Sequence, residues 1–107
     1  MQTFTERALT IIKQIPPGRI MTYGQVAAAA GSPRAARQVT RILHSMSAKY
    51  NLPWHRIVNV QGRIALIDEE SRSFQRESLQ AEGVKVDAND QIDLNRFRFD
   101  PEKDGQC

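Results

Sequence analysis

The sequence predicts a mainly α-helical fold with a small β-hairpin, arranged as a winged helix-turn-helix. Apolar residues recur at helical spacing in three stretches of the chain. The second and third predicted helices are separated by the short segment Gly31-Ser32-Pro33, which is typical of a helix-turn-helix. A later stretch turns at Gln61-Gly62 between short apolar runs, which is typical of a hairpin. The chain of 107 residues is long enough for one such domain.

The first part of the chain predicts two helices separated by an extended link. Residues 4–15 carry apolar side chains at helical spacing, and the run Pro16-Pro17-Gly18 ends that helix. Thr22 and Gln25 form a capping box, so a second helix begins there and continues to Ala30. Gly31 follows as the residue that ends it.

The next helix is predicted over residues 33–46, with Ser32 as its N-cap and Pro33 at its first position. Its buried stripe would consist of Ala36, Val39, Ile42, Leu43 and Met46. Its polar side would carry Arg34, Arg37, Gln38, Arg41 and His44. Arginines on the second helix of a helix-turn-helix are typical of a recognition helix.

A polar loop over residues 45–52 and a hairpin of residues 57–60 and 63–66 are expected next. A helix over residues 71–82 should point Phe74 and Leu79 inward and Arg72, Arg76 and Glu77 outward, and Gly83 should end it. Residues 84–86 are a candidate last strand. We expect a domain of residues 1–87 and a partly flexible C-terminal extension of residues 88–107, whose aromatic residues pack loosely.

The charge is strongly segregated along the chain. Residues 1–67 carry nine Lys and Arg and a single acid, Glu6, for a net charge of +8, whereas residues 68–107 carry a net charge of −5. A region of one sign attracts a polyanion, and nucleic acid is the commonest one. Together with the helix-turn-helix, this favours a DNA-binding domain over a plain helical hairpin.

Other classes of protein find little support in the sequence. No apolar run approaches the length of a membrane span, and no signal peptide is visible, so we expect a cytoplasmic protein. The single cysteine, Cys107, is the last residue and builds neither an internal disulfide nor a zinc site. We therefore expect no metal. We also expect no cofactor and a monomer.

The segment Pro53-Trp54-His55-Arg56 places an aromatic ring, an imidazole and a guanidinium side by side behind a stiff proline. This segment and residues 16–27 and 31–39 resemble, in the same order, the C-terminal domain of O6-alkylguanine-DNA alkyltransferases. The resemblance covers roughly residues 4–86. The transferases carry Pro-Cys-His-Arg, whose cysteine accepts the alkyl group, and Trp54 stands at that position here. The chain thus resembles the alkyltransferase-like branch of the family.

The resemblance implies a fold, a function and several roles. The family binds the lesion through the DNA minor groove and rotates the altered base out of the stack. Tyr23 matches the tyrosine that presses on the adjoining phosphate, and Arg37 matches the arginine that fills the vacated place. His55 and Glu82 match a pair that relays a proton from the cysteine, so with Trp54 present we expect them to be structural.

On this basis the expected lesion pocket comprises Tyr23, Pro53, Trp54 and His55. The expected residues for base flipping and DNA binding are Tyr23, Arg37, Thr22, Gln25, Ser32, Pro33, Arg34, Ala35, Ala36, Arg41 and Arg56. The expected partners are double-stranded DNA containing O6-alkylguanine and, as the branch implies, proteins of nucleotide excision repair.

The chemistry of the substituted position excludes alkyl transfer. Transfer needs a thiolate, and an indole is not such a nucleophile. The loop of residues 66–70 also departs from the glycine-rich loop of the transferases. We therefore expect a non-enzymatic damage sensor. The alternatives are a helix-turn-helix transcriptional regulator without lesion specificity, which leaves residues 53–56 unexplained, and a hydrolase with His55 as base, which lacks a second catalytic group.

Overall fold

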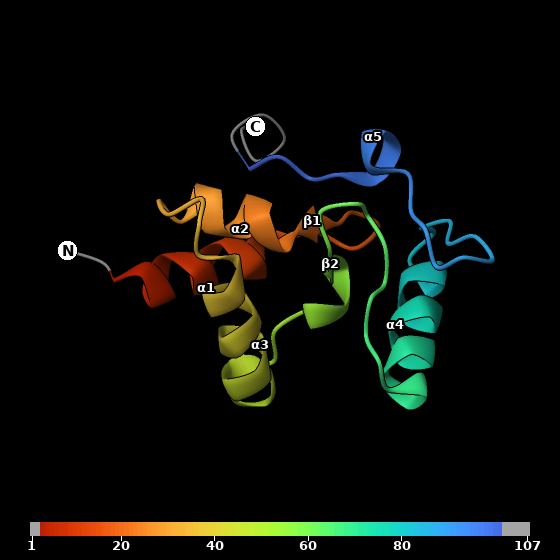
Figure 1. The fold of residues 1–107 in the computed structure, drawn as a ribbon, viewed down its shortest axis with the longest axis horizontal. Helices are drawn as coiled ribbons and strands as arrows, with labels where there is room; N and C mark the ends of the chain where they lie inside the picture. The colour runs from red at the N-terminus through yellow and green to blue at the C-terminus, as the bar shows by residue number, and fades with distance from the viewer. Residues whose placement is uncertain (1–2, 102–107) are drawn as a thin grey trace.

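The computed structural model describes residues 3–101 and is mainly helical (Figure 1). Its elements are, in order, α1 (Phe4–Gln14), β1 (Met21–Thr22), α2 (Tyr23–Ala29), α3 (Ala36–Tyr50), the 3-10 helix η1 (Trp54–Arg56), β2 (Ile57–Val58), α4 (Glu69–Ala81) and α5 (Leu94–Phe97). The predicted mainly helical, helix-turn-helix class is confirmed, with α2 and α3 as the helix-turn-helix. Among residues 3–101, no helix is both long and apolar enough to cross a bilayer.

Local signals determine the ends of α1 and α2. The Thr3 side chain accepts a hydrogen bond from the Glu6 backbone and begins α1, which ends one residue earlier than predicted. The capping box at the start of α2 is confirmed, because the Thr22 hydroxyl accepts from the Gln25 N–H and the Gln25 side chain accepts from the Thr22 N–H. Gly31 follows α2 in the left-handed region, at a φ of +100°, as predicted.

The prediction for the start of α3 is wrong. Ser32 does not cap this helix, which begins at Ala36. The Ser32 N–H instead donates to the Ala27 carbonyl and the Gly31 N–H to the Ala28 carbonyl, which is the hydrogen-bond pattern of a Schellman motif. Ser32 therefore belongs to the end of α2, and a separate turn from Ser32 to Ala35 precedes α3.

The end of α3 also differs from the prediction. The helix continues through the expected polar loop to Tyr50 and stops at Asn51, which adopts a φ of +52°. Asparagine tolerates this left-handed conformation better than most residues with a side chain. The extra turn lengthens the exposed side of α3 and brings the chain directly to the segment that begins at Pro53.

The predicted hairpin is also wrong. Ile57 and Val58 pair in parallel with Met21 and Thr22 rather than with the chain that follows them. The turn at Gly62 exists: the Gly62 N–H donates to the Asn59 carbonyl, and the Asn59 N–H donates to the Arg63 carbonyl. Beyond Arg63 the chain bonds elsewhere. The Ile64 N–H donates to the Asp90 carbonyl, so the returning segment packs beside residues 90–92.

The small sheet joins two hydrophobic clusters. The larger cluster is formed by α1, α2 and α3 and includes Met21 and Ile57. The smaller one includes Ile20, Val58 and Leu79 of α4. Because neighbouring strand residues point to opposite faces, Ile57 of β2 packs in the larger cluster and Val58 in the smaller one. The α4 side of the molecule is thereby tied to the helix-turn-helix (Figure 1).

The C-terminal part of the described chain packs more tightly than predicted. Phe97 and Phe99 are buried, and the Ile20 backbone pairs with the chain on both sides of Arg98. The expectation of loose packing is wrong for these aromatic residues. Residues 84–86 form no strand. Residues 102–107, which include Cys107 and the expected frayed tail, lie outside the described residues.

On α4 the inward prediction holds for Leu79 and fails for Phe74, which is 55% exposed. The residue buried beside it is Gln75. Arg72 and Arg76 are not simply outward, because both form ion pairs with the buried carboxylate of Asp90. The helix begins at Glu69, two residues earlier than predicted, with Asp68 as its N-cap.

Candidate nucleic-acid interface

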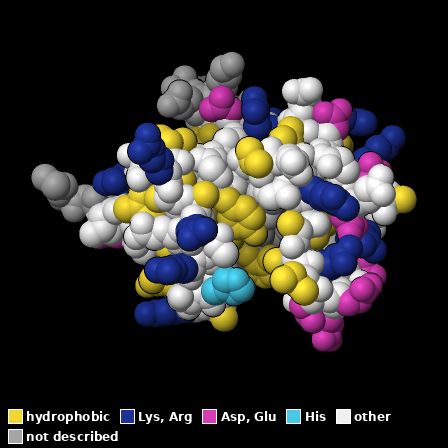
Figure 2. Space-filling view, viewed as in Figure 1, with side chains coloured by type: hydrophobic (Ala, Val, Ile, Leu, Met, Phe, Trp, Pro, Cys, Tyr) yellow, Lys and Arg dark blue, Asp and Glu magenta, His cyan; other side chains and the backbone are white. Residues whose placement is uncertain are grey.

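One side of α3 is uniformly basic and open to solvent. Arg34 precedes the helix, and Arg37 and Arg41 follow at helical spacing, all three exposed. They border a shallow groove of about 470 Å³ that also contacts Thr5 of α1. Figure 2 shows Lys and Arg side chains gathered over α1 and α3, whereas acidic side chains collect at the lower end of α4. This distribution suits a phosphate backbone lying along α3.

The beginning of α3 is suited to close approach by DNA. Ala35 and Ala36 are half-buried and small, so the backbone lies near the surface there. No side chain caps this end of the helix. The first backbone N–H groups of a helix without such a cap are available to an anion. Of the nearby residues predicted to meet DNA, Pro33 is exposed and Ser32 is half-buried.

The Pro53–Arg56 segment forms one turn of 3-10 helix between α3 and α4 (Figure 1). Trp54 is half-buried and packs against the larger hydrophobic cluster. Its ring stacks on that of Phe74, with centroids 5.6 Å apart and planes inclined by 19°. This offset geometry is a favourable aromatic contact. Trp54 is therefore held by a partner on α4 without being enclosed in the core.

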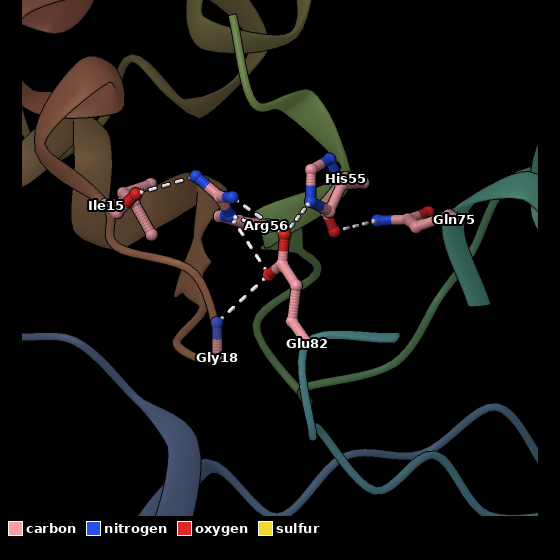
Figure 3. A network of polar contacts seen from close by, with 6 residues as sticks. All are labelled: Ile15, Gly18, His55, Arg56, Gln75 and Glu82. Atoms are coloured by element: carbon pink, nitrogen blue, oxygen red, sulfur yellow. Dashed lines mark hydrogen bonds and ion pairs between the residues drawn. The ribbon is translucent and has the colours of Figure 1, made fainter. Parts of the chain in front are cut away.

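A carboxylate network fixes this segment from behind (Figure 3). Glu82, at the end of α4, accepts from Arg56 Nη2 at 2.7 Å, and His55 Nε2 lies 2.8 Å from the same oxygen. The Gly18 N–H donates to the other oxygen at 3.0 Å. Arg56 Nη1 also donates to the Ile15 carbonyl, at 3.0 Å. The predicted proximity of His55 and Glu82 is thus confirmed, with Arg56 as a third member.

The network keeps Glu82 charged. Burial acts to raise the pKa of this carboxyl, but the hydrogen bonds from Arg56, the Gly18 backbone and His55 together outweigh it and hold the pKa at about 2. The ion pair is only 16% exposed at the side chains of Arg56 and Glu82. Because its members come from the chain after α1, from η1 and from α4, the network joins three parts of the fold at the base of the site.

Tyr23 lies at the first position of α2, half-buried against the larger hydrophobic cluster. Burial raises the pKa of its hydroxyl above the ordinary value of 10. The phenol is neutral at physiological pH, and its hydroxyl can donate a hydrogen bond.

Three residues predicted to bind DNA have internal hydrogen-bond partners. Arg56 is occupied by Glu82 and Ile15, as described above. Thr22 is 6% exposed and caps α2. The Gln25 side chain accepts from Thr22 and donates to the Phe99 carbonyl at 2.9 Å. These three side chains therefore support the interface from within the fold, and their contact with DNA stays a prediction.

Phe74 and Gln75 belong to the site although the sequence did not indicate it. Gln75 is 2% exposed, and its Nε2 donates to the carbonyls of His55 and Ile57 at 3.1 and 3.0 Å. The available signal was an aromatic residue next to an uncharged amide in the middle of a largely polar helix. Within residues 3–101, no cluster of side chains suited to a metal ion occurs.

Comparisons with known proteins agree with this geometry. Residues 3–84 match the family described as the 6-O-methylguanine DNA methyltransferase DNA-binding domain. The chain is 47% identical over 97 residues to the DNA base-flipping protein of Escherichia coli, covering 91% of this chain and 74% of that protein. It is 32% identical over 87 residues to alkyltransferase-like protein 1 of Schizosaccharomyces pombe, covering 80% of this chain and 81% of that one.

The fold matches that of a solved complex. The crystal structure of S. pombe Atl1 with damaged DNA containing O6-carboxymethylguanine superposes with a TM-score of 0.82 at 28% sequence identity. The match covers 94% of this chain and all of the other.

Proposed function

The chain belongs to the family of the 6-O-methylguanine DNA methyltransferase DNA-binding domain, and from this premise we propose that it binds O6-alkylguanine in double-stranded DNA without removing the alkyl group. In this proposal it turns the altered base out of the stack and holds it. The observation that carries the proposal is Trp54, an aromatic ring on a 3-10 turn and stacked on Phe74. The resemblance of residues 53–56 to Pro-Cys-His-Arg implies that this ring stands where the transferases carry their reactive thiol.

The ring of Trp54 suits a flipped purine. Base–aromatic stacking is worth ~1–3 kcal/mol, which offsets part of the few kcal/mol needed to unstack a base. Its indole supplies no nucleophile, so the bound lesion is not consumed and the complex is reversible. The buried network of Glu82 behind it keeps the backbone of residues 54–56 in one conformation, which reduces the ordering that binding would require.

The helix-turn-helix supplies the rest of the machinery. Arg37 is exposed on the basic side of α3 and fills the place that the base leaves. The neutral hydroxyl of Tyr23 contacts the adjoining phosphate. Arg34 and Arg41 neutralise phosphates of either strand. Readout through the minor groove is nearly independent of sequence, which suits a protein that must find damage anywhere.

A persistent complex with an extruded base is a structural signal to other proteins. We propose that it recruits the proteins of nucleotide excision repair, that the chain acts as a monomer, and that it works in the cytoplasm. The recruitment step is supported by the reversible binding and by the alkyltransferase-like character of Trp54.

The decisive experiment compares a duplex containing O6-methylguanine with its undamaged twin. Wild-type protein should prefer the lesion, and mass spectrometry should show neither a methylated protein nor a restored guanine. Trp54→Ala should lose most of this preference while keeping its affinity for undamaged DNA. Equal affinity for both duplexes would instead favour a transcriptional regulator, and transfer of the methyl group would refute the non-enzymatic proposal.

A second comparison isolates base extrusion. Arg37→Ala should weaken the signal of a fluorescent base analogue at the target position more than it weakens initial association. Lys85→Ala removes an equal charge from an exposed position in the segment after α4 and is the matched control. Thermal melting of all variants separates a binding defect from unfolding. If Arg37→Ala and Lys85→Ala had the same effect on the signal, the role assigned to Arg37 would be wrong.

A further inference from the structure

Phe74 is an apolar ring in an unusual position. Four large apolar side chains are exposed within residues 3–101, namely Tyr50, Val60, Ile67 and Phe74. Of these, Phe74 is stacked on a residue of the proposed lesion site, the ring of Trp54. It remains 55% exposed in that contact. Roughly half of its surface is therefore left beside Trp54 for another group to cover.

The position of this ring is fixed by its neighbour in the sequence. Gln75 is buried, and its amide donates to the backbone carbonyls of His55 and Ile57. These bonds tie α4 to the turn that carries Trp54. Phe74 and Trp54 thus form one rigid two-ring unit, of which Trp54 is the more buried part.

The charges around Phe74 restrict what can cover it. Glu70 and Glu77 lie four residues before and three residues after it, on the same side of α4, and both are exposed. Figure 2 shows acidic side chains at the lower end of α4, across the molecule from the basic side chains over α1 and α3. A DNA phosphate is repelled from such a position. The group that covers Phe74 in the complex therefore carries no negative charge, and the aromatic surface itself favours an apolar group.

We propose that Phe74 determines which O6 substituents the protein prefers, by supplying the apolar surface that the substituent covers when the base stacks on Trp54. This inference rests on the proposed function. The methyl group of O6-methylguanine covers little of the ring, whereas a longer alkyl chain covers more. Each methylene removed from water at this surface adds up to about fourfold in affinity. Affinity should therefore rise with the length of an uncharged alkyl chain.

The test measures binding to three duplexes that differ at one base: guanine, O6-methylguanine and O6-butylguanine. Trp54 is the single tryptophan of the chain, so its fluorescence reports occupancy of the site directly. Wild-type protein should bind the butyl lesion about tenfold more tightly than the methyl lesion. Phe74→Ala should bring this ratio close to one and leave the affinity for undamaged DNA unchanged.

Two further variants make the result specific. Phe74→Gln keeps the length of the side chain and removes the aromatic surface, and it should act as Phe74→Ala does. Val60→Ala removes apolar surface from a side chain that is 77% exposed, near the turn at Gly62, and should leave the ratio unchanged. Because Phe74 is largely exposed, both of its variants should fold, and melting curves check this.

The outcomes separate this inference from the proposed function. If wild-type protein prefers both lesions over guanine but the Phe74 variants keep the wild-type ratio of butyl to methyl affinity, the inference is wrong and the proposed function stands. A uniform weakening of both lesions would mean that Phe74 only positions Trp54, which also overturns the inference. If wild-type protein prefers neither lesion over guanine, the proposed function itself fails.

Discussion

Replacing Glu82 by glutamine should lower the free energy of unfolding. The difference between the folded-state pKa and the ordinary pKa of this carboxyl sets the size of the effect. The folded-state pKa of this carboxyl is about 2, against an ordinary value of 4.5, and at roughly 1.4 kcal/mol per pKa unit the difference corresponds to about 3 kcal/mol. Glutamine keeps the shape and some of the hydrogen bonds to Arg56 and Gly18 but removes the charge. We expect Glu82→Gln to lower the free energy of unfolding at pH 7 by about 2–3 kcal/mol.

The dependence on pH gives an independent check of the same number. The pKa is depressed in the folded state, so the stabilisation is fully present above pH 4.5 and is lost as the pH falls toward 2. Wild-type protein should lose about 2 kcal/mol of this contribution between pH 7 and pH 3. The Glu82→Gln variant lacks the titrating group, and its stability should fall by that much less over the same interval.

Urea unfolding followed by Trp54 fluorescence measures both effects at constant ionic strength. The matched control is Glu77→Gln, which removes the same charge from an exposed position on α4 and should change the stability by less than about 0.5 kcal/mol. The reasoning is refuted if Glu82→Gln and Glu77→Gln are equally stable at pH 7. It is also refuted if wild type and Glu82→Gln lose stability in parallel on acidification.

Other predictions concern the second carboxylate, the backbone and the basic helix. The hydrogen bonds from Arg72 and Arg76 of α4 lower the pKa of Asp90. Asp90→Asn should therefore lower the free energy of unfolding, measured with urea, by about 2 kcal/mol at neutral pH, and by less below the ordinary pKa of 3.8. Gly62→Ala should lower the melting point, because the φ is +77° and the new Cβ would lie 2.8 Å from a carbonyl oxygen; Gly24→Ala, where the space is open, is the control. Arg41→Ala should weaken binding to damaged and undamaged DNA alike and flatten the salt dependence by about one unit, whereas an unchanged slope would place this side chain off the phosphates.

Local patterns in the sequence were sufficient for the first two helices. The cap at Thr22 and the glycine at position 31 act through hydrogen bonds that span only a few residues, so the sequence alone predicts where α2 begins and ends. The segment Gly31-Ser32-Pro33 gave a wrong prediction for the start of α3, because Ser32-Pro33 also matches the pattern of a helix start. Ser32 could belong to the end of α2 or to the start of α3. The hydrogen bond from its backbone N–H to the Ala27 carbonyl places it at the end of α2.

Pairing between distant segments could not be predicted in the same way. Met21 and Ile57 bond in parallel across 36 positions of the chain, whereas the apolar runs around Gly62 suggested a local hairpin. The turn at Gly62 is present as expected, but the Ile64 N–H beyond it donates to the Asp90 carbonyl. Such a choice depends on which surfaces meet when the helices pack, and periodicity along the chain does not contain that information.

For the candidate site, the sequence by itself determined the chemistry and the tertiary structure decided the roles. The basic face of α3 and the indole in place of a thiol follow from the order of the residues alone. Arg56 was expected at the DNA, and only the approach of Glu82 from α4 turns it inward. Phe74 was expected in the core, and only the packing of α4 beside η1 places it on Trp54. The charge or the ring of a side chain is given by the sequence. Its contact partner depends on the fold, because residues 20 or more positions apart meet only after the helices and strands have packed.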